Sequence, residues 1–322
     1  MANAVNIQKI IEEYGKYYIP GSQNMQRLRH AVMQAPVTLE KHGHLITTLE
    51  TEYRMANPSF ESLIQPFKAT FSPKGGVTFH PNAIKVPKVK IDLSLTPDEI
   101  EDSWLQFMAG VDPADKRNWP IVRWIMEVYI PQQAGKDRET KMVYKGVYNE
   151  DGATPADCMD GIRKKLIDGV SDSYPINVIS GIGALDKSSM VDQVEAFDEA
   201  LPSEYLEEKV IIFVAPEFYR AYLKNYRENG WFNMQSSKEI VGVIDFTGSN
   251  HVLAPLPSMA GTADMFATVK ENMLWIRNRD PKEFKTFIQQ DHYNVDIMVN
   301  WREAVGFACN QMVWTTIETV GG

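Results

Sequence analysis

Two histidines, His42 and His44, have the spacing of a chelating pair, and Glu40 stands close to them in the chain. On a strand, residues i and i+2 point to the same face and could bind one ion together. Protein zinc sites use three or four ligands from the chain, and the spacing here offers no third one. We therefore favour a solvated turn around Gly43 and predict no metal ion.

A Gly-x-Gly pair, Gly181 and Gly183, follows an apolar stretch in the manner of a dinucleotide-binding loop. The third glycine of that fingerprint is absent, because Asp186 stands in its place. The chain also has neither a Walker phosphate-binding loop nor a G-x-S-x-G nucleophile elbow. A simple loop is the favoured interpretation, and we predict no cofactor.

Catalytic side chains are equally hard to assemble. Cys158 could act as a nucleophile only beside a histidine base, and none is close in the sequence. The carboxylates Asp98, Glu99, Glu101 and Asp102 could be paired acids, but the start of a helix explains them more simply, because its dipole favours negative charge. The sequence therefore predicts no catalytic residue and a chain that is not an enzyme.

The stretch of residues 66–108 is the part around which we expect the chain to be organised. Residues 66–95 are predicted to form a two-stranded ribbon, which turns at residues 72–76, where proline and two glycines occur together. In the return strand the apolar residues Val89, Ile91 and Leu93 alternate with polar ones. A two-stranded ribbon is at best marginally stable in water, so this one must pack on another surface.

A capped helix is predicted directly after the ribbon. Thr96 suits the N-cap position, Pro97 the first helical position, and Glu99 the third, where it completes a capping box. A second helix is predicted over residues 121–129, and we expect Pro131 to kink or end it, with helix resuming at Lys136.

The second half of the chain combines helices with many strands. Residues 210–215 form a continuous apolar run, typical of a fully buried strand, and a helix is predicted from Pro216 to Gly230. A short helix is also predicted over residues 157–167, another over 190–200, a hairpin around residues 240–253, and several strands over 271–318. The predicted fold class is α+β.

Composition limits the functions further. The chain has 322 residues, a net charge of −9 and a pI near 5.3, which argues against nucleic-acid binding through clustered lysine and arginine. Its two cysteines, Cys158 and Cys309, make no disulfide framework and fit a reducing compartment. No apolar run approaches the ~20 residues that span a bilayer, and we expect a soluble protein made inside the cell.

The order of these parts resembles the major capsid proteins of tailed bacteriophages, which have the Hong Kong 97 fold. Residues 88–103 (KVKIDLSLTPDEIEDS) look like the family's junction between extended loop and spine helix. Residues 145–162 are similar to its glycine-bearing loop, and residues 210–230 to the strand and helix of its axial domain. Residues 292–307 resemble its closing peripheral strands.

The resemblance implies five parts. They are an N-terminal arm (1–50), an extended loop (51–95), a spine helix with the first part of a peripheral domain (96–175), an axial domain (176–265) and C-terminal peripheral strands (266–322). The residues expected to contact a neighbouring subunit in the extended loop are Phe67, Lys68, Phe71, Lys74, Gly75, Gly76, Val77 and Phe79. Thr96 and Glu99 are expected to cap the helix at the base of this loop.

The function implied is a shell subunit that assembles with copies of itself into pentamers and hexamers around double-stranded DNA, in a virion assembled in a bacterial host's cytoplasm. Portal, scaffolding or decoration proteins are further expected partners, and no membrane is involved. Two alternatives stay open: an encapsulin-type compartment, and an α+β enzyme with an unrecognised site.

Overall fold

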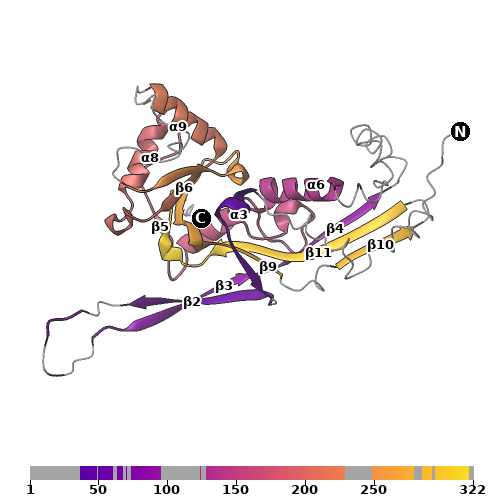
Figure 1. Cartoon of the computed structure of the whole chain (residues 1–322), viewed down its shortest axis with the longest axis horizontal. Helices are drawn as coiled ribbons and strands as arrows, with labels where there is room; N and C mark the ends of the chain where they lie inside the picture. The colour runs from indigo at the N-terminus through magenta and orange to yellow at the C-terminus, as the bar shows by residue number, and fades with distance from the viewer. Residues whose placement is uncertain are drawn as a thin grey trace, which may run out of the picture.

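The computed structural model describes residues 37–48, 50–60, 64–67, 70, 74–95, 124, 128–228, 249–278, 285–291 and 294–318. Within them the chain forms three β-sheets, with helices packed around two of them, so the predicted α+β class is confirmed (Figure 1). None of the helices in these ranges is long and apolar enough to cross a membrane.

The first of two five-stranded sheets is organised around strand β11, which pairs with neighbours on both of its edges. Its strands are β1 (His44–Thr48), β4 (Lys88–Leu95), β9 (Met273–Asn278), β10 (Lys285–Asp291) and β11 (Asn294–Phe307). The first half of β11 pairs with both β10 and β4, and its second half pairs with β9. Strand β1 pairs in parallel with β9 and completes the sheet.

A helical segment packs on this sheet, formed by α6 (Ile130–Asp137) and the π-helical turn η3 (Arg138–Met142). Pro131 lies in the first turn of α6, where a backbone N–H has no partner to lose. Tyr129 before it is also in the α region, so a helix end at Pro131, with helix resuming only at Lys136, is wrong.

A buried ion pair joins this helical segment to the sheet. The guanidinium of Arg138 binds both carboxylate oxygens of Glu303 on β11, through Nε to Oε2 at 2.9 Å and a second nitrogen to Oε1. The indole nitrogens of Trp275 and Trp301 donate to the same carboxylate at 2.7 and 3.0 Å. Burial alone would raise the pKa of Glu303, but the charge of Arg138 and these hydrogen bonds lower it below its usual value.

A second sheet forms the separate lobe seen at the upper left of Figure 1. Its strands, in spatial order, are β5 (Asn177–Val178), β12 (Val313–Thr315), β8 (Met265–Val269), β6 (Val210–Val214) and β7 (Val252–Pro255). Helices α8 (Met190–Glu199) and α9 (Pro216–Glu228) pack against it through apolar faces. The predicted helix over 190–200 and the predicted buried strand are confirmed, since every residue of β6 is buried.

Several short elements lie between these strands and helices along the chain. They are α3 (Val37–His42), η4 (Pro155–Asp157), α7 (Ile162–Val170), η5 (Ser203–Tyr205), η6 (Pro257–Met259), η7 (Lys270–Asn272) and η9 (Asn310–Met312). The helix predicted over residues 157–167 is in fact two elements, because the extended backbone of Gly161 separates η4 from α7. Strand β7 pairs in parallel with β6, and most of the remainder of the predicted 240–253 hairpin lies outside the described residues.

The ribbon is present, but its strands differ from those predicted. It consists of β2 (Glu52–Phe60) and β3 (Val77–Lys85), paired antiparallel over their full length. The predicted return strand, Val89 to Leu95, is β4 and pairs with β11 instead, so its assignment to the ribbon is wrong. The physical reason is burial: the alternating apolar face of β4 packs on the main core, where Val89 is only 4% exposed.

The predicted boundaries between the parts of the chain do not coincide with the sheets of the structure. Residues 37–48 of the predicted arm belong to this subunit's own body, with Leu39 fully buried and β1 paired to β9. Strand β12, expected among the peripheral strands, lies in the sheet of the upper lobe between β5 and β8. Residues 1–36 of the arm lie outside the described residues.

Candidate functional site

The two-stranded ribbon is the strongest candidate for a functional element because it leaves the body and carries apolar side chains into solvent (Figure 1). Among the residues of β3 whose burial is described, only Ile84, at the root, is buried. Ile84 is 2% exposed, whereas Phe79, five residues nearer the end of the ribbon, is 64% exposed. The ribbon therefore has a buried root and an exposed outer part.

The root of the ribbon is fixed by a small apolar cluster of its own. Ile84 and Val86 are buried against Leu274, Ile276 and Ala304 of the main sheet. Close packing here depends on a glycine, because a Cβ atom at Gly306 would lie 2.6 Å from Cδ1 of Ile84. The missing side chain is what lets the ribbon cross β11 at this point.

Hydrogen bonds secure the same root. Asn82 Nδ2 donates to the carbonyl of Phe307 at 2.9 Å, and Arg302 donates to the carbonyl of Val86 at 3.1 Å. The backbone N–H of Val86 donates to the carbonyl of Thr51 at 2.8 Å, which closes the base of the two strands. The root is thus attached to the body by both packing and directional bonds.

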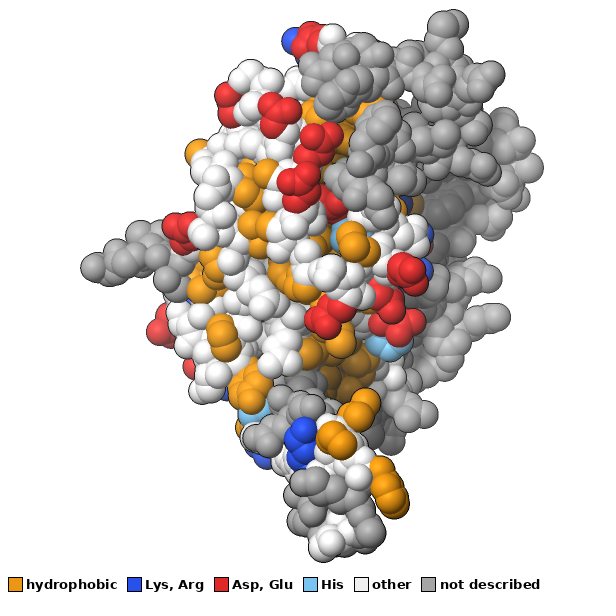
Figure 2. Space-filling view, turned by 90° about the vertical axis from the view of Figure 1, so that its left-hand side faces the viewer, with side chains coloured by type: hydrophobic (Ala, Val, Ile, Leu, Met, Phe, Trp, Pro, Cys, Tyr) orange, Lys and Arg blue, Asp and Glu red, His pale blue; other side chains and the backbone are white. Residues whose placement is uncertain are grey.

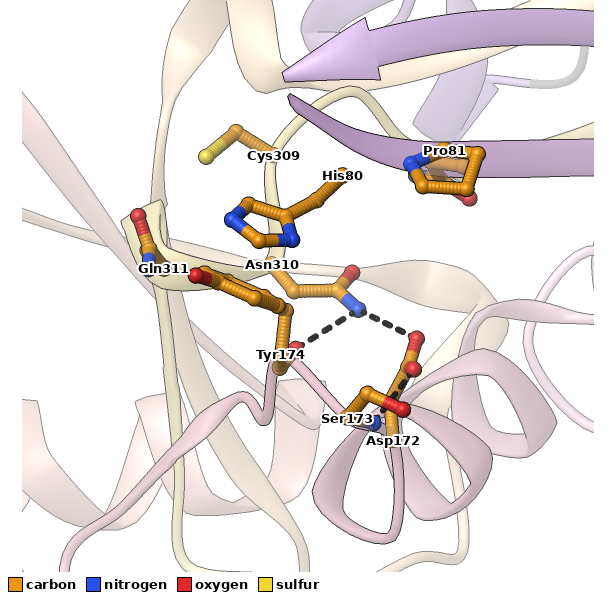
Figure 3. Close-up of a pocket in the computed structure, with 9 residues that line it drawn as sticks. His80, Pro81, Asp172, Ser173, Tyr174, Cys309, Asn310 and Gln311 are labelled. Carbon is orange, nitrogen blue, oxygen red and sulfur yellow. Dashed lines mark hydrogen bonds between the residues drawn. The ribbon is translucent and has the colours of Figure 1, made fainter. Parts of the chain in front are cut away.

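A polar cavity of about 130 Å³ lies beside this root (Figure 3). The ring of His80 on β3 stacks on that of Tyr174, with centroids 3.1 Å apart. Asn310 also lines the cavity, and its amide nitrogen donates to Asp172 at 3.3 Å and to the carbonyl of Tyr174 at 3.2 Å. Within the described residues, His80 Nε2 is buried without a hydrogen-bond partner, so this contact is a ring stack and not a polar bond.

The outer part of the ribbon is exposed. Ile64 and Phe67, in the segment between β2 and β3, are 89% and 94% exposed. Lys74 Nζ donates to the carbonyl of Ile64 at 3.0 Å, and Gly75 has a φ of +88°, which favours glycine. The lower end of Figure 2 shows hydrophobic side chains standing beside basic ones on this projecting part.

The residues predicted to contact a neighbour fall into two groups. Those that the structure describes are Phe67, Lys74, Gly75, Gly76, Val77 and Phe79, all in or next to the exposed outer ribbon. Lys68, Phe71, and the predicted cap residues Thr96 and Glu99 lie outside the described residues.

A groove on the body was not predicted from the sequence. It has a volume of about 620 Å³ and lies between β4, α6 and the loop of residues 148–158. Its lining is largely apolar and includes Val89, Ile91, Leu93, Tyr129, Ile130, Ala134, Met142 and Trp301. These residues come from three distant parts of the sequence, so no local spacing could have revealed them.

The predicted absence of a metal site can be compared with the geometry around His42. In the described part of the chain, no group of three or more His, Cys, Asp or Glu side chains could hold an ion. His42 ends α3, half-buried and edge-on to Phe213 at 4.9 Å, so it is not in a fully solvated turn. Burial lowers its pKa to about 4, and the positive charges of Lys41 and Lys270 add to the effect.

The glycine pair and Cys158 have local structural roles. Gly181 and Gly183 have φ values of +92° and +73°, and nothing lies within 4 Å of a Cβ atom built on either. Backbone conformation, not a close approach, thus explains them. Burial raises the pKa of the Cys158 thiol, and the charges of Asp157 and Glu303 raise it further, which opposes formation of a nucleophilic thiolate.

Comparisons with known proteins identify the fold. No protein-family model matches the chain, and neither does any curated protein. Among solved structures, the satellite phage P4 procapsid with its size determination (Sid) protein matches at a TM-score of 0.58 and 13% identity, over 99% of this chain and 98% of that chain.

Two further structures match over most of their length. The capsid of an empty GTA particle has a TM-score of 0.52 at 10% identity, over 97% of this chain and 98% of that chain. The capsid of Myoviridae phage XM1 has a TM-score of 0.51 at 12% identity, over 88% of this chain and 92% of that chain. The chain therefore has the fold of tailed-phage capsid subunits, the Hong Kong 97 fold that the sequence predicted.

Proposed function

We propose that this chain is the major capsid protein of a tailed phage, and that identical copies build an icosahedral shell around double-stranded DNA. The single observation that carries the proposal is the ribbon, which is fixed at its root and exposes Ile64, Phe67 and Phe79 at its outer part. A monomer gains nothing from holding these side chains in water. A neighbouring copy that covers them gains the free energy of their burial.

The receiving surface is the apolar groove on the body of the neighbour. Its walls of Val89, Ile91 and Leu93 on one side and Ile130 and Ala134 on the other offer apolar contact. A contact between two different patches of the same chain is heterologous, and repeated contacts of this kind close into rings when the rotation permits. Pentamers and hexamers are the rings expected of a shell with this fold.

The charge of the chain fits the proposed content of the shell. A net charge of −9 disfavours tight binding of phosphates, so the wall would enclose DNA without holding it. The proposal places the protein in the virion after assembly in the host cytoplasm. Portal, scaffolding or decoration proteins are the partners that such a shell would add.

The encapsulin-type compartment and the enzyme are less well supported. The three neighbours described above are phage or GTA particles, which favours a genome-containing shell. In the described residues no group of three or more His, Cys, Asp or Glu side chains could hold a metal ion, and the raised pKa of Cys158 opposes a nucleophilic thiolate.

Electron microscopy of the purified full chain tests the proposal. The expected result is closed shells of uniform size, with DNA inside those isolated from phage-producing cells. A chain that stays monomeric at all concentrations would overturn it. Shells that contain co-purifying enzymes and no DNA would favour the encapsulin-type compartment instead.

A further inference from the structure

Two helices of the upper lobe carry opposite charges, and no ion pair among the described residues joins one helix to the other. On α8, Asp192, Glu195 and Glu199 follow at i, i+3 and i+7, so they share one face, and no lysine or arginine occurs in that helix. We call these three residues the acidic ridge. The opposite face of α8 is buried in the core.

The neighbouring helix, α9, has the complementary pattern. Arg220, Lys224 and Arg227 follow at i, i+4 and i+7, all exposed, on the side opposite the buried residues of that helix. We call these three the basic ridge. Among the described residues, the acidic contact of the basic ridge is that of Lys224 with Glu228 at 3.6 Å, which is highly exposed and lies within α9 itself.

The two ridges do not neutralise each other, although α8 and α9 pack together on the same sheet (Figure 1). Every residue of both helices is described, and no ion pair of 4.0 Å or less joins them. Partial burial raises the pKa of Glu195, and the charges of Asp192 and Glu199 raise it further, with no cation offsetting the effect. The acidic ridge is therefore a site of like-charge repulsion that an external cation would relieve.

The acidic character continues beyond α8. Glu204, Glu207 and Glu208 are exposed on the segment that follows, and the charges of Glu204 and Glu208, after burial, raise the pKa of Tyr205. Figure 2 shows acidic side chains gathered over the upper half of one face of the molecule, with few basic ones among them. A partner for this face needs positive charge.

We propose that the acidic ridge on α8 of one copy contacts the basic ridge on α9 of the next copy around each ring. This inference rests on the proposed shell function and names the charged contact that orders the subunits. A ring needs head-to-tail contact, in which the acidic ridge of each copy meets the basic ridge of the next and the same pair of ridges repeats around the ring. The ridges thus favour one direction of ring closure and speed the encounter of subunits at low salt.

Charge reversal tests this contact. The acid-reversed chain carries Asp192→Lys, Glu195→Lys and Glu199→Lys, the base-reversed chain carries Arg220→Glu, Lys224→Glu and Arg227→Glu, and the combined chain carries all six. We expect each single reversal to lower shell yield by about tenfold or more, because like charges then face each other. The combined chain should regain most of the yield. Normal yield from either single reversal, or no recovery in the combined chain, would overturn the contact.

A control and a mixing experiment sharpen the result. Reversal of three exposed acids away from the lobe's helices, Glu50, Glu271 and Glu318, makes the same change in net charge and should leave the yield unchanged. Mixing the two single-reversal chains allows alternating rings, which close for six subunits but not for five. Six-membered rings without closed shells are therefore expected from the mixture, and five-membered rings would contradict the pairing.

Two further measurements distinguish a variant that fails to fold from one that folds but lacks the charged contact. Circular dichroism and thermal melting show whether each reversed chain folds, as the exposure of the ridges leads us to expect. For the unaltered chain, shell yield should fall between about 0.05 M and about 0.5 M salt, because screening shortens the reach of surface charges, and a constant yield would count against the contact. If the unaltered chain makes no shells at all, the proposed function fails, and the ridge contact fails with it.

Discussion

Replacing Phe67 by alanine should separate folding from assembly. The side chain is 94% exposed and contributes almost nothing to the subunit's own core, so its removal should change the free energy of unfolding by less than about 0.5 kcal/mol. If a neighbour's groove covers it in the shell, each contact loses roughly 1.5–3 kcal/mol of burial. That loss lowers the association constant of each contact by about 10- to 150-fold.

The assay is the lowest protein concentration at which shells appear, followed by light scattering and electron microscopy, with thermal melting of the unassembled subunit measured in parallel. Val37→Ala is the control, since Val37 is an exposed apolar side chain on the body, 45% exposed, at the start of α3. Phe213→Ala, at a core position 1% exposed, should instead destabilise the subunit itself by about 3–5 kcal/mol. Shells of Phe67→Ala at the unaltered concentration would refute the reasoning, and so would a large fall in its melting temperature.

Three other predictions concern the body. Gly306→Val should destabilise the subunit by about 1–3 kcal/mol, because the new side chain overlaps Ile84 at the ribbon root; chemical denaturation measures this, and an unchanged midpoint would contradict the packing described. Glu303→Gln should cost about 3–5 kcal/mol by removing the carboxylate charge that pairs with the buried guanidinium of Arg138. The folded pKa of Glu303 is lowered, so its contribution is present above the unfolded value and is lost as pH falls through the folded one; melting curves of the Gln variant should lack this acid loss. His42 has a folded pKa of about 4 against an ordinary 6.5, so the unfolded chain binds the proton more readily and stability falls as pH drops from 6.5 to 4. Because His42 is partly exposed, solvent screening reduces this loss of folding stability to about 1–2 kcal/mol. In urea titrations, His42→Gln should abolish the loss.

Local patterns in the sequence were enough to predict α8, β6 and α9 of the upper lobe. The apolar run before Pro216 could form only a buried strand, and the helix after it follows from spacing and from proline at its start. The alternation of Val89 to Leu95 correctly predicted a half-buried strand. Alternation fixes the face of a strand but not its partner, and the partner here, β11, is about 200 residues away in the chain.

Of the candidate site, one part could be predicted from local sequence and another could not. The exposed outer ribbon was predictable because Phe67, Phe79 and the turn glycines follow one another closely in the sequence. The groove was not predictable, because it forms only when β4, α6 and the 148–158 loop meet. The stack of His80 on Tyr174 likewise joins residues whose sequence positions give no sign of contact.

Strand β11 has a mechanical consequence for the proposed shell. A pull on the ribbon passes from β3 through Val86 and Pro87 directly into β4, whose eight residues are all paired to β11. When such a load acts along the strand axis, it is shared by the whole ladder of backbone hydrogen bonds, which must yield together. A load across the strands would break the same bonds one at a time. The subunit is therefore expected to resist stretching along β4 far better than peeling, and single-molecule pulling in the two directions would measure that difference.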